Sequence, residues 1–341
     1  MNAAHTMRAR PLDAVRLGLG CAQLGDLFRP LGDDEAEGVV SAAWDEGIRY
    51  FDTAPHYGLG LSEQRLGRAL RGRPRDEFIV STKVGRLIRP RVDRHTDVRG
   101  ERSAAFHREW DFSRDGILRS IEESLERLDL DRLDIVLMHD VGERYPEALR
   151  SAVPTLVELR DEGVIRALGA GDGDAGTLSS FAREADIDVV LEAGRYTLVD
   201  RTAELELLPA CARHGVAVIA AGVFNTGLLA VPEPQAGAKF EYADADAGRL
   251  ALARELARLC ASYGVELPAA ALQFPLRESA VTTVLVGAET PQQIEQTAAR
   301  LRAPIPQPVW DALDAMRSDG TGIDKPPASP DNETHPAIDY R

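Results

Sequence analysis

Eight short apolar runs, separated by longer segments of helical period, constrain the fold of this chain more than any other feature. Such alternation is typical of repeated βα units and a parallel sheet. In the helical segment that follows the third run, the apolar residues Ile117, Ile121, Leu125 and Leu128 fall on one face. The predicted strands are 17–21, 50–54, 78–83, 135–139, 165–170, 189–192, 216–221 and 283–286.

The ends of the predicted helices carry cap signals. In the stretch "TPQQ", Thr290 suits the N-cap, Pro291 suits the first helical position, and Gln293 is expected to complete a capping box. Glycines that favour a left-handed C-cap close four helical segments, and they are Gly47, Gly163, Gly215 and Gly264.

The simplest architecture is one closed (β/α)₈ TIM barrel over residues 1–317, and a doubly wound sheet is the alternative. Segment 86–111 follows the third strand and is too long for an ordinary βα connection, so we expect a functional or disordered loop there. The tail 318–341 is dense in Pro, Asp, Asn and Ser, which predicts a poorly ordered or surface-draped segment.

Charge and cysteine content limit the partners of the chain. A net charge of -15 with no basic block argues against nucleic acid or an acidic membrane surface and favours a small-molecule ligand. Three scattered cysteines offer neither a disulfide framework nor a CxxC metal site, so we expect a cytoplasmic protein. No apolar run reaches the roughly 18 residues of a membrane span. Oligomer formation stays open.

Polar residues at the strand ends are the candidates for chemistry, because barrel active sites lie there. Asp52 and Tyr57 follow the second strand, Lys83 ends the third, and His139 ends the fourth. Each alone fits an ordinary structural role. Together, Lys83 paired with Asp52 is expected to lower the pKa of Tyr57 below its usual value of about 10, which suits a general acid or base. His139 would orient the reacting oxygen.

The stretches "FDTAPHYGLGLSE", "STK", "LMHD", "FAREADIDVVLEAGRYTLVD" and "AALQFPL" resemble the aldo-keto reductases, in the branch of sugar and pyridoxal dehydrogenases. The resemblance extends over about residues 15–316 and implies a catalytic tetrad of Asp52, Tyr57, Lys83 and His139. It also implies hydride transfer with NADP or NAD bound across the barrel mouth. For this branch, the oxidation of a sugar lactol or of cyclic pyridoxal gives a lactone.

The resemblance places the dinucleotide phosphates against two segments. In "AGVFNTG" the matching residues are Gly222, Phe224 and Thr226, and "VGAETPQQ" is the second segment. Members that prefer NADP carry Lys or Arg in the second segment, whereas this chain has a carboxylate and small or amide residues. NAD is therefore favoured over NADP. The residues at these positions are Gly287, Ala288, Glu289 and Gln293.

This chain departs from the family pattern around the nicotinamide. Asp172 stands where an Asn usually holds the carboxamide, and a carboxylate only accepts hydrogen bonds. Ala193 replaces a glutamine partner of the same group, and Ala221 replaces a tyrosine that stacks under the ring.

Substrate contacts are expected from residues that face the same mouth. These are His56, Trp110, Phe112 and either Arg195 or Tyr196, although Trp110 and Phe112 fit equally well as pins for the long loop. Ser62 is predicted to cap the helix after Tyr57. Three functions follow: an NAD-dependent dehydrogenase of lactols or polyols, an NADPH-dependent carbonyl reductase with Arg300 near the 2′-phosphate, or a nucleotide-binding barrel without catalysis.

Overall fold

The eight predicted strands form a closed parallel barrel in a computed structural model, which describes residues 15–90 and 105–318. The order around the barrel is β1-β12-β9-β8-β7-β6-β3-β2. The bounds are β1 Leu17–Gly20, β2 Tyr50–Asp52, β3 Ile79–Val84, β6 Ile135–His139, β7 Ala167–Asp172, β8 Val189–Ala193, β9 Ala217–Ala221 and β12 Val281–Gly287.

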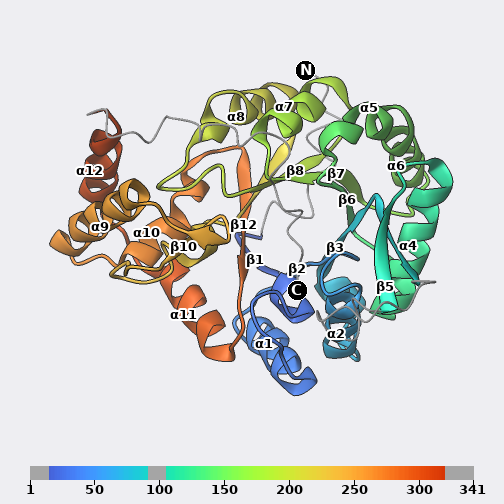
Figure 1. The fold of residues 1–341 in the computed structure, drawn as a ribbon, viewed down its shortest axis with the longest axis horizontal. Helices are drawn as coiled ribbons and strands as arrows, with labels where there is room; N and C mark the ends of the chain where they lie inside the picture. Colours follow the sequence, from blue (N-terminus) through green and yellow to red (C-terminus); the bar gives the residue numbers. More distant parts are fainter. Residues whose placement is uncertain (1–14, 91–104, 319–341) are drawn as a thin grey trace.

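Helices surround the strands and separate them from solvent (Figure 1). They are α1 Asp33–Asp45, α2 Leu61–Leu70, α4 Arg114–Leu128, α5 Tyr145–Glu147, α6 Val153–Asp161, α7 Ala175–Glu184, α8 Leu207–His214, α9 Ala247–Ser262, α10 Leu267–Gln273, α11 Pro291–Arg302 and α12 Gln307–Ser318. The predicted closed barrel is confirmed, and every strand end lies within two residues of its predicted position.

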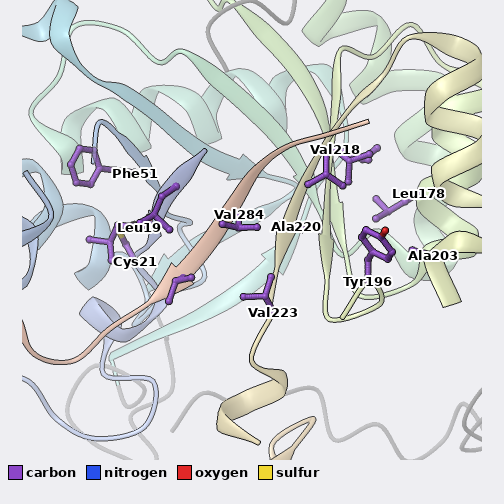
Figure 2. Close-up of a cluster of buried hydrophobic side chains, with 14 of the residues drawn as sticks. Leu19, Cys21, Phe51, Leu178, Tyr196, Ala203, Val218, Ala220, Val223 and Val284 are labelled. Carbon is purple, nitrogen blue, oxygen red and sulfur yellow. The ribbon is translucent and has the colours of Figure 1, made fainter. Parts of the chain in front are cut away.

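Two apolar layers hold this architecture together. A smaller layer fills the barrel, where Tyr50, Leu137 and Ile219 point inward. A larger layer lies between the strands and the helices. Figure 2 shows part of this layer, in which Leu19 and Val284 come from neighbouring strands β1 and β12. Successive side chains of a strand point to opposite faces, so each strand contributes residues to both apolar layers in turn.

The long segment after β3 differs from the expected loop. Its two ends form an antiparallel ribbon of β4 (Arg86–Pro90) and β5 (Phe106–Trp110), in which Arg86 pairs with Trp110. Of the two expected alternatives, a functional or a disordered loop, disorder does not apply to these residues, because backbone pairing across the segment gives them regular structure. Residues 91–104 and 319–341, which include the predicted irregular tail, lie outside the described residues.

A second small ribbon, β10 (Lys239–Phe240) with β11 (Ala243–Asp244), lies in the connection after β9. The predicted glycine caps are confirmed, since all four glycines have positive φ; they are Gly47, Gly163, Gly215 and Gly264. Thr290 also caps α11 as predicted, accepting a bond from the N–H of Gln293.

Candidate active site

Asp52 and Lys83 meet in a buried ion pair at the carboxyl ends of β2 and β3. The Lys83 Nζ donates to Asp52 Oδ2 at 2.7 Å, to the carbonyl of Thr53 at 2.9 Å and to the Tyr57 hydroxyl at 3.0 Å. The hydroxyl of Ser81 donates to the other carboxylate oxygen at 2.6 Å. Only 2% of Lys83 is exposed, so its three donors are directed at fixed partners.

The loop between β2 and α2 presents Tyr57 to this pair. Gly25 packs so closely on the backbone of Tyr57 that a side chain at position 25 would clash with it. Ser62 donates to the carbonyl of Cys21 at 2.6 Å and bonds the Thr53 hydroxyl at 2.9 Å. The predicted Ser62 cap is wrong, because α2 begins after Gly60, whose φ of 86° suits glycine. Ser62 instead anchors the loop.

His139, the last residue of β6, completes the predicted group of four. Its ring centroid lies 5.9 Å from that of Tyr57, with the two planes at 90°. Burial, followed by the positive charges of Arg86 and Lys83, lowers the pKa of His139 well below its ordinary value. His139 is therefore a neutral imidazole that can donate one N–H to an oxygen beside Tyr57. The structure thus brings Asp52, Tyr57, Lys83 and His139 together.

The pKa of Tyr57 differs from the expectation. Burial raises the pKa of the Tyr57 phenol well above its ordinary value, and the negative charges of Asp52 and Asp140 add to the effect. The direction is opposite to the predicted lowering, because burial disfavours the charged phenolate and the nearby carboxylates add to that effect. Tyr57 consequently holds its proton at neutral pH, as a general acid does.

Arg86 and Asp140 belong to the same mouth and were not predicted. The Nη2 of Arg86 donates to Asp140 Oδ2 at 2.7 Å, and its Nη1 lies 3.1 Å from His56 Nδ1. Asp140 directly follows β6, and Arg86 follows the end of β3 after one residue, Gly85. Extending the strand-end rule by a few positions beyond Lys83 and His139 would have found them.

His56 lies buried between Arg86 and the catalytic group. Its ring centroid is 5.6 Å from that of His139, with the planes at 88°. Burial first, then the charge of Arg86, lowers the pKa of His56 to about 2. His56 is thus a neutral imidazole whose Nδ1 faces a guanidinium, so it fills space beside the reaction centre without adding charge.

The two aromatic residues of the long segment have different surroundings. Trp110 is 37% exposed and lies under the guanidinium of Arg86 at 4.3 Å. Phe112 is fully buried, stacks on Trp110 at 5.9 Å between centroids, and packs against Gly85, whose φ is 100°. Phe112 fits the alternative role of a pin for the long segment. It anchors the ribbon, which leaves Trp110 as the aromatic residue that faces solvent.

Arg195 is engaged by other protein groups. Its guanidinium donates to Asp200 at 2.9 Å and to the carbonyl of Gly173 at 2.9 Å, and it forms an ion pair with Glu241. Glu241 belongs to the turn of the β10–β11 ribbon, so Arg195 ties the connection after β8 to that ribbon. Next to Glu241, Tyr242 stacks on Phe28 at 6.1 Å from the connection after β1.

A cavity of about 590 Å³ lies between the β4–β5 ribbon and the connection after β6. Trp110 and Asp140, which directly follows His139, line it, and the connection after β6 supplies the remaining wall. That wall carries both signs of charge, and its charged residues are Glu143, Arg144, Glu147 and Arg150. Such a lining offers donors and acceptors together, which suits a neutral, polar ligand.

The predicted cofactor residues lie on the connections that follow β7, β9 and β12. Gly222 has a φ of 65° and packs against the backbone of Gly194. Thr226 also has positive φ, at 57°. Phe224 is half-buried against the main apolar layer. Asp172 ends β7, and burial together with Asp140 raises its pKa to about 7.

The side chain of Gln293 differs from the expected capping box. Its Oε1 accepts a bond from the N–H of Glu289 at 2.7 Å rather than from that of Thr290. The bond spans four residues and tightens the turn that leads from Gly287 into α11. The expected reciprocal bond to Thr290 is therefore wrong.

Three buried side-chain oxygens near these connections have no hydrogen-bond partner among the described residues: Gln23 Oε1, Asn225 Oδ1 and Glu289 Oε1. Buried polar atoms without partners are rare in folded proteins and call for an explanation. All three are acceptors, so they fit a ligand that carries hydroxyl or amide donors. A nicotinamide dinucleotide has such donors on its riboses and its carboxamide, and the residues present fit it.

Arg29 lies beside the second cofactor segment, where the sequence showed no basic residue. Its Nε is 3.4 Å from Glu289 Oε2, and its Nη2 is 3.1 Å from Glu35 Oε1. Arg29 reaches this position from the connection between β1 and α1. Its guanidinium is shared by two carboxylates, which reduces the positive charge that it offers to a phosphate.

The fold and the four candidate side chains indicate a class of protein, a (β/α)₈ barrel with a tyrosine hydrogen-bonded to a lysine at its mouth and a neutral histidine beside it. The aldo/keto reductase family model matches residues 16–318. The chain therefore belongs to the aldo-keto reductase family, and it is an oxidoreductase whose family uses nicotinamide cofactors.

Curated relatives support this assignment. The chain is 48% identical to a D-threo-aldose 1-dehydrogenase from Pseudomonas sp, over 88% of this chain and 93% of the relative. It is 39% identical to a pyridoxal 4-dehydrogenase from Microbacterium luteolum, over 91% and 95%. Family membership with dehydrogenase relatives supports an enzyme and argues against the non-catalytic barrel that the sequence left open.

A solved structure is similar over most of the chain. The glycerol dehydrogenase from Gluconobacter oxydans aligns with a TM-score of 0.72 at 25% identity, covering 92% of this chain and 94% of that structure. Within residues 15–90 and 105–318, no helix is long and apolar enough to cross a membrane. In the same residues, no group of three His, Cys, Asp or Glu side chains is placed to hold a metal ion.

Proposed function

We propose that this chain is an NAD-dependent dehydrogenase that oxidises the lactol carbon of a small aldose to a lactone, with carbonyl reduction as the reverse reaction. The observation that carries the proposal is the Lys83 ammonium, hydrogen-bonded to both Asp52 and Tyr57. The similarity to a D-threo-aldose 1-dehydrogenase supports an aldose as substrate. The similarity to a pyridoxal 4-dehydrogenase supports a cyclic hemiacetal in general.

The four side chains divide the work of the reaction. When bound, the nicotinamide supplies or accepts the hydride. In the oxidative direction Tyr57, as the phenolate, accepts the hydroxyl proton of the lactol as the carbon–oxygen double bond forms, and in reduction Tyr57, as the phenol, donates a proton to the carbonyl oxygen. Lys83 stabilises the phenolate that results, and Asp52 holds Lys83 in place. His139 donates its N–H to the reacting oxygen and sets the orientation of that oxygen.

The surroundings of the second cofactor segment support NAD over NADP. Glu289 brings a carboxylate with a partner-free buried oxygen, which accepts bonds from ribose hydroxyls and repels a phosphate. The nearby cation, Arg29, is already paired with Glu289 and Glu35. A lower KM for NADP than for NAD would contradict this part of the proposal.

Asp172 is the proposed partner of the nicotinamide carboxamide. With a pKa of about 7, its carboxyl group holds a proton in half of the molecules near neutral pH. A protonated carboxyl group donates one hydrogen bond and accepts others, as an amide does. A protonated Asp172 therefore supplies the hydrogen-bond donor that is lost when Asp replaces the usual Asn.

The substrate is proposed to bind on the side of His56 and Trp110. Trp110 offers an exposed ring next to the cavity of about 590 Å³, and aromatic rings stack on sugar faces. Arg195 contributes by holding the β10–β11 ribbon at the opposite side of the mouth. We further propose a cytoplasmic location, which suits the buried free thiols of Cys21, Cys211 and Cys260.

A second candidate is an NADPH-dependent carbonyl reductase. The raised pKa of Tyr57 favours it, because a phenol that keeps its proton is ready to protonate a carbonyl oxygen. To bind the 2′-phosphate of NADPH, Arg29 would have to break its ion pairs with Glu35 and Glu289. Arg300, the residue suggested by the sequence, is paired with Glu266 at 3.1 Å.

A turnover screen tests these candidates. Fucose, arabinose, pyridoxal and simple aldehydes are offered with NAD, NADP and their reduced forms, and the change in NADH absorbance is measured. The proposal expects lactol oxidation with NAD to have the highest kcat/KM. Faster reduction of aldehydes with NADPH would favour the second candidate. No turnover and no thermal shift with any of the four nucleotides would contradict both.

A further inference from the structure

Arg86 lies beside the proposed catalytic residues, on a strand outside the barrel. Its Nη2 binds Asp140 Oδ2 at 2.7 Å, its Nη1 lies 3.1 Å from His56 Nδ1, and its guanidinium lies 4.3 Å from the centre of the Trp110 ring. Its Nε is buried and has no hydrogen-bond partner in the described part of the chain. A charged group in so dry a place is costly unless its contacts matter to the protein.

The oxygen that Arg86 binds also faces His139. Asp140 Oδ2 lies 3.4 Å from His139 Nε2, farther than from Arg86. The carboxylate therefore has two possible partners, and Arg86 holds it at hydrogen-bond distance. If Arg86 released Asp140, the carboxylate could take a direct bond from His139 and stabilise a protonated ring.

We propose that Arg86 is a positioning residue, which binds Asp140 so that His139 stays neutral and directs its N–H at the reacting oxygen instead of at the carboxylate. The inference deepens the proposed function and rests on it, since it assigns His139 the role of holding the substrate oxygen. Arg86 itself touches neither substrate nor the reacting atoms.

The charges around His139 agree with this role. Lys83 comes from β3, Arg86 from β4 and Arg108 from β5, and their charges all lower the pKa of His139. His56 and Tyr57 face it from the β2–α2 connection. On the negative side, Asp140 follows His139 in the chain, and Asp172 follows its strand partner Gly171. Asp140 is the carboxylate nearest to the ring, and Arg86 is the cation bound to it.

Arginine suits this position better than lysine does. A planar guanidinium directs N–H groups along two edges, so Arg86 binds Asp140 with one nitrogen while another faces His56. The Trp110 ring lies against its plane, and Trp110 is its strand partner in the β4–β5 ribbon. A lysine would keep the charge but could not make both contacts in a fixed plane.

The test compares Arg86→Gln with the wild type in the pH dependence of kcat/KM and in the NMR titration of His139. In the wild type His139 is expected to stay neutral through the working pH range, because burial and the nearby positive charges hold its pKa well below the ordinary value. In Arg86→Gln its pKa is expected to rise toward the ordinary value, and kcat/KM should fall about tenfold per pH unit below the pKa that the NMR titration gives for the variant. His139→Asn identifies the NMR signal.

Arg89→Gln is the matched control, because Arg89 lies on the same strand and pairs with Glu109 and Glu123 away from the site. It should keep the wild-type pH profile. The double variant Arg86→Gln with Asp140→Asn should return the pKa of His139 toward the wild-type range, since it removes the competing carboxylate. Arg86→Lys should give an intermediate profile.

Two results would overturn the inference: a wild-type His139 that titrates near its ordinary pKa of about 6.5, or an Arg86→Gln variant with the pH profile and the His139 pKa of the wild type. The wild-type titration needs no variant to fold. Both NMR measurements are independent of turnover, so a wild type that turns over no substrate would contradict the proposed function while the inference about His139 would still be tested.

Discussion

The two ends of the barrel use the same chemistry, a buried aspartate next to a cation, for different purposes. At the amino end, Asp134 precedes β6 and accepts from Arg75 at 2.6 Å and from the N–H of Val80 at 2.8 Å. Asp188 precedes β8 and accepts from Arg160 at 3.1 Å and from the N–H of Leu168 at 3.0 Å. Each carboxylate thus binds the backbone of the preceding strand of the barrel.

At the carboxyl end, Asp52 accepts only from side chains, Lys83 and Ser81, in the described contacts. Lys83, the cation of this pair, also donates a hydrogen bond to the titratable hydroxyl of Tyr57. A buried pair that binds backbone N–H groups stabilises the sheet, whereas a pair that ends on a phenol can move a proton. The two kinds of ion pair are both buried, so burial does not distinguish a structural pair from a proposed catalytic one. The group that the pair binds, a backbone N–H or a titratable hydroxyl, makes the distinction.

Tyr57→Phe should have the largest effect at the carboxyl end. Removing the hydroxyl deletes the proton donor and acceptor, so kcat should fall by about 10²–10⁴ while the affinity for NAD stays nearly unchanged. Steady-state kinetics and a thermal-shift titration measure the two quantities. Turnover close to the wild-type rate would show that the proton moves through another group.

At the amino end, Asp188→Ala should lower the stability of the protein and leave its kcat unchanged. It leaves Arg160 paired with the more exposed carboxylates of Asp186 and Asp161 and frees the N–H of Leu168, so the free energy of unfolding should fall by about 2 kcal/mol. Urea unfolding measures the loss. The kcat of the folded fraction should stay at the wild-type value, and a drop of kcat with unchanged stability would remove the distinction between the two ends.

The rate of lactol oxidation should rise with pH. Because burial raises the pKa of Tyr57 well above its ordinary value, the phenolate that accepts the proton is scarce at neutral pH. The oxidation rate should therefore increase about tenfold per pH unit from about pH 7 toward that pKa, unless bound cofactor lowers it. Rates from about pH 6 to about pH 10 check this, with Asp134→Asn as a control that keeps the same profile. A flat profile would show a lowered pKa in the working enzyme.

Asp172→Asn should have the smallest effect. In the wild type the carboxyl group loses its proton, and with it the donor, as pH rises through about 7, so the KM for NAD should increase by a few fold over that interval. An amide keeps donor and acceptor at all pH values, and the variant should show a KM that is independent of pH. The same pH dependence in both proteins would exclude Asp172 as its source.

The sequence predicted the barrel and the four catalytic candidates because both follow from local pattern. Strands β6 and β8 come from apolar runs with clear ends, and His139 is identified by its position at one of those ends. The long segment was harder to predict. Its regular structure comes from pairing between Arg86 and Trp110, which a pattern within either stretch does not show.

Local pattern in this sequence thus determined the order of strands and helices, the closed barrel and the residues that end each strand. Only the tertiary structure decided what those residues do to one another. The sign of the pKa shift at Tyr57 depends on burial, and Arg29 meets Glu289 across 260 positions of the chain. Periodicity repeats within a few residues, whereas desolvation and charge pairing depend on distances that exist only after the barrel has closed.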